Sequence, residues 1–282
     1  MNIDSIQMRL KTYSQKHKRV HQFTIIRYFQ ERFLYRLSKS KYRDNFLLKG
    51  GALVYYLSNQ TSRYTKDVDL LLKQLKSDHN LLKAIFTEIC EMEFNDGVIF
   101  VTKDLRIEDI QKEGLYTGTR IKVLAKLGNI KHQMQIDIGT GDYVTPRPQE
   151  IIYPTLLDEL EPPKLKAYTV ETVISEKFEA MIALGEHNSR MKDFYDVYQF
   201  LGNCKTRILE EAIENTFRIR KTPVIPDHPI FTDSFYQDQK RVNQWRKFLE
   251  INELEKVEFG EIGKRIQKDL KIIYENLREK SL

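Results

Sequence analysis

Residues 46–72 read FLLKGGALVYYLSNQTSRYTKDVDLLL, and this stretch decides the fold. Its apolar start runs into Gly50-Gly51, and paired glycines permit a tight turn with a close approach of the backbone. Ala52–Leu57 follows with the composition of a short helix, so its first N–H groups face the glycines. The arrangement predicts an anion-binding cradle suited to a triphosphate, with Gly50 and Gly51 as nucleotide-binding residues.

The end of the same stretch predicts a strand that carries two carboxylates. Asp67 and Asp69 alternate with Val68 and Leu70, and alternate residues of a strand share a face. Adjacent carboxylates repel each other unless a cation lies between them, and hard oxygen ligands suit Mg²⁺. A solvated acidic pair at the end of a strand is the alternative. The order strand, glycine turn, helix, strand favours a metal site that faces the cradle.

A third acidic residue lies in a predicted hairpin. Ile121–Leu127 and Gln133–Ile138 each alternate apolar and polar residues, and Gly128-Asn129 between them is a turn signal. Asp137 is flanked by two isoleucines that face the core, so its carboxylate needs a partner if the strand is central. An aspartate on an edge strand is the alternative to a metal ligand.

The glycine pair followed by DVD resembles the first motif of the polymerase-β-like nucleotidyltransferase superfamily. The longer text FLYRLSKSKYRDNFLLKGGALVYYL…RYTKDVDLLL is similar to the AbiEii/AbiGii family of nucleotidyltransferase toxins. The resemblance covers most of residues 1–250 and weakens toward the C-terminus. It implies that Asp67, Asp69 and Asp137 are catalytic and bind Mg²⁺, with Mn²⁺ as an alternative, and that an NTP is the substrate.

A second candidate region begins with the predicted helix 169–184, TVETVISEKFEAMIAL. Lys177 lies on or beside its apolar face, and a lysine there is expected to pair with Glu171 or Glu176 or to extend toward solvent. The stretch VISEKFEAMI resembles a motif of the same toxins. The resemblance implies that Lys177 is an active-site residue that contacts the phosphates of the nucleotide.

The following predicted helix, 191–201, carries two aspartates in its first half. Asp193 and Asp196 are helix neighbours, and acidic residues in a first turn stabilise the helix dipole without any catalytic role. The stretch RMKDFYD also resembles the toxins. The resemblance implies that Asp193 is an active-site residue, either a base or an orienting partner for Lys177.

Basic residues elsewhere leave two interpretations open. Arg63 and Lys66, in the loop before Asp67, either bind phosphate or offset the charge of the carboxylates. Residues 205–282 are predicted to be mainly helical, with a break at 222–231, and basic residues there are interleaved with aromatic ones around Trp245. Such a surface suits RNA, although an amphipathic helix with Trp245 inside explains the same pattern.

The predicted elements and the resemblance together imply an α+β protein, and the length of 282 residues allows two lobes. Residues 1–145 are expected to form a nucleotidyltransferase lobe with N-terminal helices and a small mixed sheet, and residues 146–282 a helical lobe with further active-site residues. The boundary is placed in the segment 143–168, because its five prolines disfavour both helix and sheet. A net charge of +6 mildly favours a polyanionic partner.

The remaining composition excludes several classes of protein. Two cysteines without a C-x-x-C spacing argue against disulfides and zinc and fit a reducing cytoplasm. No apolar run approaches the ~20 residues that a membrane span requires.

The expected activity is transfer of a nucleoside monophosphate from an NTP to an acceptor, with release of pyrophosphate. The family resemblance implies the tRNA 3′ end as acceptor and a separately encoded antitoxin as partner. A protein or small-molecule acceptor is one alternative, and a non-catalytic RNA- or partner-binding protein is another.

Overall fold

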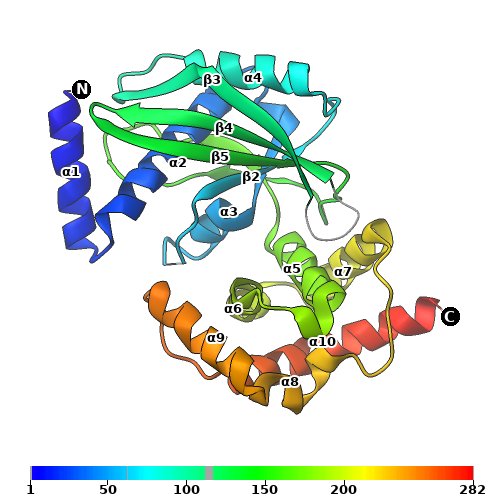
Figure 1. The fold of residues 1–282 in the computed structure, drawn as a ribbon. Coiled ribbons are helices and arrows are strands. Elements are labelled where there is room, and N and C mark those ends of the chain that lie inside the picture. Colours follow the sequence, from blue (N-terminus) through cyan, green and yellow to red (C-terminus); the bar gives the residue numbers. More distant parts are fainter. Residues whose placement is uncertain (1, 62, 112–116, 282) are drawn as a thin grey trace. The chain divides into compact units, whose positions relative to one another are not determined.

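The computed structural model describes residues 2–61, 63–111 and 117–281. The chain separates into two compact units, each described by itself below. The first comprises residues 1–141 and 149–167 and contains the sheet; the second comprises residues 142–148 and 168–282 and is helical. The predicted α+β class is therefore confirmed (Figure 1).

The sheet of the first unit is mixed and has the strand order β3-β4-β5-β2-β1-β7-β6. Strand β2 pairs in parallel with β5, and β1 pairs in parallel with β7, whereas the other neighbours are antiparallel. The candidate acidic residues therefore lie on central strands. The bounds are β1 Phe46–Lys49, β2 Asp67–Leu72, β3 Val98–Gln111, β4 Thr117–Leu127, β5 Ile130–Gly139, β6 Gln149–Ile152 and β7 Lys164–Ala167.

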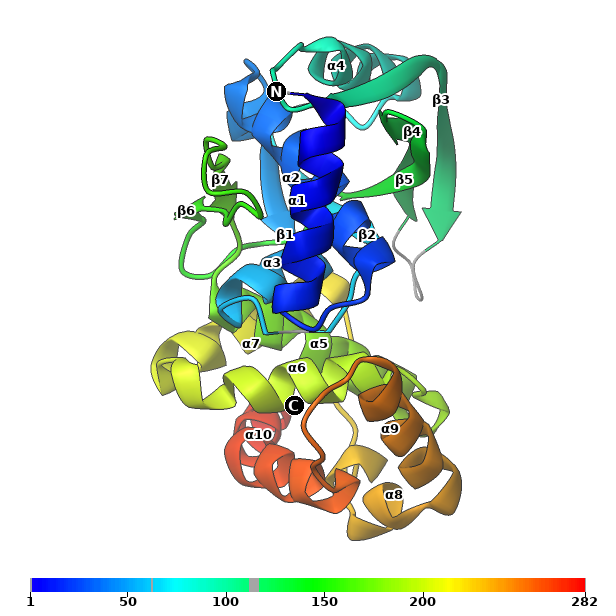
Figure 2. The ribbon, with the colours of Figure 1, turned by 90° about the vertical axis from the view of Figure 1, so that its left-hand side faces the viewer.

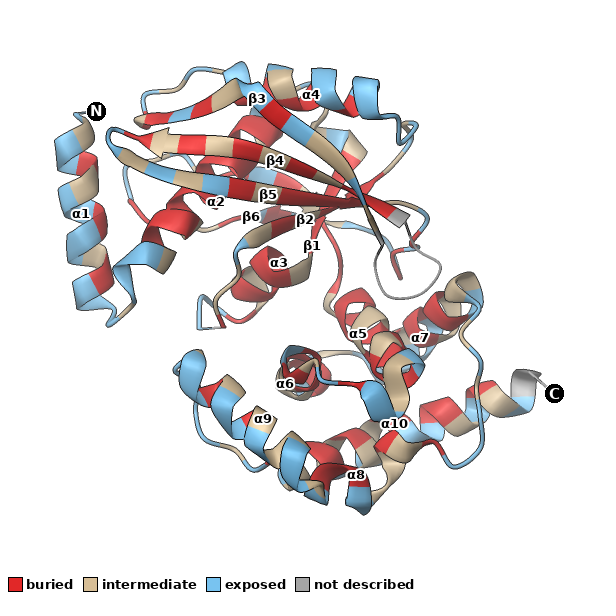
Figure 3. Ribbon diagram, viewed as in Figure 1, coloured by how far each residue is buried: buried red, intermediate tan, exposed pale blue. Residues whose placement is uncertain are grey.

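Helices α2 and α4 cover one face of this sheet (Figure 1). Phe33 of α2 stacks on Phe86 of α4 at 5.9 Å, and Phe86 meets Phe46 of β1 edge-on at 5.4 Å. Helix α2 is buried along most of its length rather than on one stripe (Figure 3), and α1 packs along it (Figure 2). The helices of this unit are α1 Ile3–Lys16, α2 His21–Lys39, α3 Gly50–Leu57 and α4 His79–Glu91.

Four elements differ from the sequence-based expectation. The strand expected at 98–101 continues to Gln111 as β3, and α3 begins at Gly50 rather than at Ala52. Strands β6 and β7 lie within the proline-rich segment. The prolines flank these two strands and do not interrupt them, so no ladder hydrogen bond is lost. Residues 149–167 consequently belong to the first unit.

Over its described residues, the second unit packs six α-helices around an aromatic core. Phe194 of α6 meets Phe259 of α10 edge-on at 5.3 Å, and Trp245 of α9 stacks on Phe259 at 5.2 Å. The predicted break at 222–231 is confirmed, since α7 ends at Arg220 and only a short 3-10 turn precedes α8. Its helices are α5 Val170–Leu184, α6 Met191–Phe200, α7 Thr206–Arg220, α8 Asp233–Gln237, α9 Gln239–Ile251 and α10 Phe259–Ser281. Among the described residues, no helix combines the length and apolar character needed to traverse a bilayer.

Candidate active site

The register of β2 against its neighbours brings three carboxylates together. Asp69 lies beside Asp137 of β5 in the parallel ladder, and Asp67 lies two residues away on the same face of β2. One carboxylate oxygen from each of the three lies within 4.8 Å of the other two. Val68 and Leu70, which alternate with Asp67 and Asp69 along β2, are fully buried on the opposite face. The predicted alternation of β2 is confirmed.

Because they lack side chains, the paired glycines pack closely against Asp69 and Thr65. Gly50 has a φ of 64°, and a Cβ there would lie 1.9 Å from Oδ2 of Asp69. A Cβ on Gly51 would lie 2.5 Å from Oγ1 of Thr65, whose hydroxyl donates to Oδ1 of Asp67 at 2.7 Å. The turn therefore packs the start of α3 directly against Asp69, and against Asp67 through Thr65. No side chain caps this helix start among the described residues, so its first N–H groups keep the anion-binding character expected of them.

Asp137 has a partner that the sequence analysis missed. Its carboxylate is 3% exposed and accepts two hydrogen bonds from Arg120, at 2.8 and 2.9 Å. Those hydrogen bonds raise the pKa of Arg120, against the lowering effect of burial. The predicted hairpin contained the signal for this pair, because Arg120 and Asp137 are equally far from the turn and lie directly opposite each other.

The donor set of this cluster suits a hard divalent cation. Asp67 and Asp69 are half-buried, and the two offer carboxylate oxygens on one face of the sheet. Asp137 accepts from Arg120 with both oxygens, but each carboxylate oxygen has a second lone pair. Three negatively charged carboxylates at such distances repel one another unless cations compensate their charge. Arg120 supplies one such positive charge, and a bound metal ion would supply another.

The two cationic loop residues are placed differently. Arg63 is buried and donates from Nη1 to the carbonyl oxygen of Tyr64 at 3.5 Å. Lys66 is exposed immediately before Asp67, and its charge contributes to lowering the pKa of His132, after the larger effect of burial. Lys66 is thus the more accessible of the two for a phosphate.

In the second unit, Lys177 is held by two buried aspartates. Its ammonium lies 2.8 Å from Oδ1 of Asp193 and 2.7 Å from Oδ2 of Asp196, and both carboxylates are almost fully buried. The sequence analysis expected Glu171 or Glu176 as the partner of Lys177, whereas these two contacts are with Asp193 and Asp196. The expected pairing of Lys177 with Asp193 is present. From the sequence, Asp196 was interpreted only as a residue that stabilises the helix dipole. In the structure it is also a buried ion-pair partner of Lys177.

The electrostatics of Asp193 favour orientation of Lys177 over proton transfer. Burial alone would raise the pKa of Asp193, yet Lys177 and Arg190 hold this pKa below its ordinary value. The Nε atom of Arg190 lies 2.7 Å from the second oxygen of Asp193. A carboxylate that stays ionised in this way is a weak base. Of the two roles that the resemblance implied for Asp193, the geometry supports the orienting one.

Arg220 and Trp245 belong to the segment 205–282, whose basic and aromatic residues suited RNA; Arg220 is partly buried and Trp245 is buried. Arg220 binds Glu179 at 2.7 Å and Asp142 at 3.1 Å, so it serves a partly buried ionic network. Trp245 is 1% exposed and donates from Nε1 to the carbonyl oxygen of Val257 at 2.7 Å. Neither side chain is available to stack on a base. The amphipathic-helix interpretation therefore accounts for Trp245.

Replacing Arg120 with glutamine is expected to destabilise the first unit. The buried Asp137 would keep its charge without its bidentate partner, which costs about 2–4 kcal/mol of unfolding free energy. Urea unfolding followed by circular dichroism measures this cost. Lys122→Gln is the matched control, because Lys122 lies on the same face of β4 but forms a more exposed pair with Glu108; its expected cost is below about 1 kcal/mol. Equal costs for the two variants would contradict the assigned role of Arg120.

The fold has counterparts among solved structures. Two solved structures resemble the chain: JHP933 from Helicobacter pylori (12% identity, TM-score 0.52, covering 93% of this chain and 96% of that one) and a protein described as a candidate nucleotidyltransferase from H. pylori (13% identity, TM-score 0.51, covering 92% and 98%). At such identities the likeness concerns the fold alone. The two comparisons therefore show that the chain shares the fold of those structures.

The family follows from the sequence. Residues 32–260 match the family model described as "Nucleotidyl transferase AbiEii toxin, Type IV TA system". The chain therefore belongs to the AbiEii nucleotidyltransferase toxin family, and the resemblance found in the sequence is confirmed. Family membership makes it a nucleotidyltransferase that uses an NTP and has an antitoxin partner. No curated protein matches the sequence.

Proposed function

We propose that this toxin transfers a nucleoside monophosphate from an NTP to the 3′ end of tRNA, in the cytoplasm, and so blocks translation. The observation that carries the proposal is the contact between the Gly50-Gly51 turn and Asp69, within a cluster of three carboxylates. A phosphate cradle and a group of hard oxygen ligands in contact with each other suit a metal-bound triphosphate.

Each residue of the first unit has a distinct role in this proposal. Asp67, Asp69 and Asp137 would hold Mg²⁺, and the bound cation would neutralise the negative charge of the triphosphate. The N–H groups at the start of α3 would bind phosphate oxygens, because the close packing of Gly50 on Asp69 places this helix start beside the carboxylates that would hold the metal. Arg120 fixes the carboxylate of Asp137, and Thr65 fixes that of Asp67. Such fixed ligands contribute positioning, which is a large part of catalysis in phosphoryl-type transfer.

Lys177 is proposed as a phosphate contact, the role that the family resemblance implied. Support comes from its environment in the second unit, where Asp193 and Asp196 hold its ammonium group in one position. A lysine fixed in this way loses little rotamer freedom when it binds an anion. Lys66 is retained as a second candidate contact because its side chain is exposed beside Asp67.

The test is incubation of the purified protein with total tRNA, Mg²⁺ and each of the four α-³²P-labelled NTPs in turn. We expect label from at least one NTP on tRNA, and a periodate-treated tRNA pool is the control because its 3′ hydroxyls are destroyed. A protein fraction and a small-molecule fraction are resolved from the same reaction. Label that appears only in protein or in a small molecule would reject tRNA as the acceptor and support nucleotidylation of the labelled species.

A further inference from the structure

The first unit contains a pocket outside the acidic cluster, with a volume of about 310 Å³. Residues from α1, α2 and α3 line it, together with the loop that leads toward Asp67 and a single leucine from a later segment. A pocket of this size lies at the lower end of the range that accommodates small ligands. Its lining is Tyr13, His17, Arg19, Phe23, Thr24, Arg27, Tyr55, Asn59, Gln60, Thr61, Tyr64 and Leu156.

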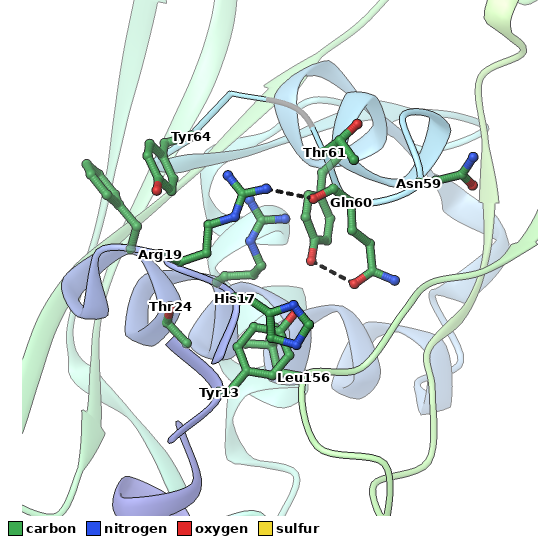
Figure 4. A pocket seen from close by; sticks show the side chains of 12 residues that line it. Tyr13, His17, Arg19, Thr24, Asn59, Gln60, Thr61, Tyr64 and Leu156 are labelled. Carbon is green, nitrogen blue, oxygen red and sulfur yellow. Dashed lines mark hydrogen bonds between the residues drawn. The ribbon is translucent and has the colours of Figure 1, made fainter. Parts of the chain in front are cut away.

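Flat rings make up much of the lining. Tyr13 and His17 stack with centroids 4.2 Å apart, and Phe23 and Tyr64 stack at 4.1 Å. Figure 4 shows His17 lying over Tyr13, with the Arg19 side chain extending toward Gln60. Arg19 also lies over the Tyr64 ring, with its Cζ 5.9 Å from the ring centroid. Aromatic faces and guanidinium planes are the usual platforms for nucleic acid bases.

The charged lining is entirely cationic. Arg19 and Arg27 contribute guanidinium groups, and none of the described lining residues is acidic. Arg27 lies over the Tyr55 ring at 3.1 Å, and its buried Nη1 has no hydrogen-bond partner. Among the described residues, neither arginine lies within ion-pair distance of a carboxylate. A buried guanidinium N–H without an acceptor is costly, and an anionic ligand would satisfy it.

We propose that this pocket binds a nucleotide, with its phosphate on Arg19 and Arg27 and its base against the aromatic rings. Guanidinium groups suit phosphate because they combine charge with several fixed donors. Gln60 accepts from the Tyr55 hydroxyl with Oε1, and Thr61 donates to the carbonyl oxygen of Ser58. The amide N–H groups of Gln60 and the lone pairs of the Thr61 hydroxyl, in the same pocket, suit the polar edges of a base. The sequence run Lys16–Arg19, which composition alone would assign to a solvated surface, contributes His17 and Arg19 to this site.

The test measures binding to the full chain by isothermal titration calorimetry. The probes are adenosine 5′-monophosphate, a 5′-phosphorylated RNA tetramer, and inorganic phosphate. EDTA is present throughout, so any site that depends on a divalent cation stays empty and the result is independent of the transfer reaction. Arg19→Gln and Arg27→Gln are each expected to raise the Kd of a nucleotide probe roughly tenfold. Lys16→Gln is the matched control: it removes the same charge from the same segment outside the pocket, and its expected change is below about twofold.

A fourth variant tests the aromatic half of the site. Tyr64→Leu retains an apolar side chain beside Phe23 but removes the ring. This variant is expected to raise the Kd of the nucleotide probes roughly tenfold and to leave the Kd of inorganic phosphate unchanged. Arg27→Gln removes a guanidinium packed on Tyr55 and can unfold the site, so Arg19→Gln, at the rim of the same pocket, keeps the test decisive.

The outcomes separate the sources of the nucleotide. Weakening of both nucleotide probes assigns the pocket to nucleotides in general, and tetramer binding without binding of the monophosphate assigns it to a nucleotide within an RNA chain. Equal effects of Arg19→Gln and Lys16→Gln would overturn the proposal, because bulk charge would then explain the binding. Inorganic phosphate that binds as tightly as the nucleotide would also overturn the proposal, because the aromatic rings would then contribute nothing to binding.

Discussion

Asp69→Asn is expected to lower the rate of nucleotidyl transfer by at least about a thousandfold, the equivalent of roughly 4 kcal/mol in the activation barrier. Asp69 lies between the other two acidic residues of the cluster and against Gly50. Its amide would keep the shape of the side chain but lose the negative charge that a cation requires. The measurement is the initial rate of label transfer to tRNA in the assay with labelled NTP.

Stability separates this effect from misfolding. Removing one of three crowded carboxylates relieves repulsion, so the unfolding free energy of Asp69→Asn is expected to stay within about 1 kcal/mol of wild type. Asp104→Asn is the matched control, because Asp104 is exposed on β3 of the same sheet; its rate should equal that of wild type. If Asp69→Asn transfers label as fast as Asp104→Asn, the carboxylate has no catalytic role.

Gly50→Ala is expected to have the second largest effect, on both activity and stability. The new Cβ would lie 1.9 Å from Oδ2 of Asp69, and alanine disfavours the φ of 64° at this position. Asp69 must therefore move out of the acidic cluster. We expect a loss of about 2–4 kcal/mol in unfolding free energy and a rate at least about a hundredfold lower. Urea unfolding and the initial transfer rate measure the two effects.

Gly141→Ala provides the matched control for that substitution. Gly141 also has a positive φ, of 88°, but a Cβ there would meet nothing within 4 Å. This variant carries the backbone strain without the collision, so we expect a cost of about 1 kcal/mol and a transfer rate close to that of wild type. If Gly50→Ala behaved like Gly141→Ala, close contact between the turn and Asp69 would not matter for function.

Local patterns in the sequence predicted the parts of the candidate site correctly. Alternation placed Asp67 and Asp69 on one face of a strand, and the paired glycines predicted the turn before a short helix. The hairpin prediction placed Asp137 among core-facing isoleucines and stated that it needs a partner. These features repeat over two to four residues or lie within one turn, so a short window of sequence contains them.

The extent and membership of the sheet were less predictable. Five prolines between residues 143 and 168 suggested a segment without strands, yet β6 and β7 fit between them. Strand β7 is placed by pairing in parallel with β1, which lies far away in sequence. Propensity describes what a segment prefers alone, whereas pairing with a buried partner strand can override it.

The sequence by itself determined the type of each element of the candidate site, the faces of the carboxylates, and the family. Only the tertiary structure decided which of these residues meet. The parallel pairing of β2 with β5 places Asp69 beside Asp137, and the packing of α5 against α6 gives Lys177 two buried aspartates. The pocket around Arg27 likewise draws on α1, α2 and α3 at once. The physical reason is that periodicity is a property of neighbouring residues, whereas contacts between distant segments follow from burying all the apolar faces together.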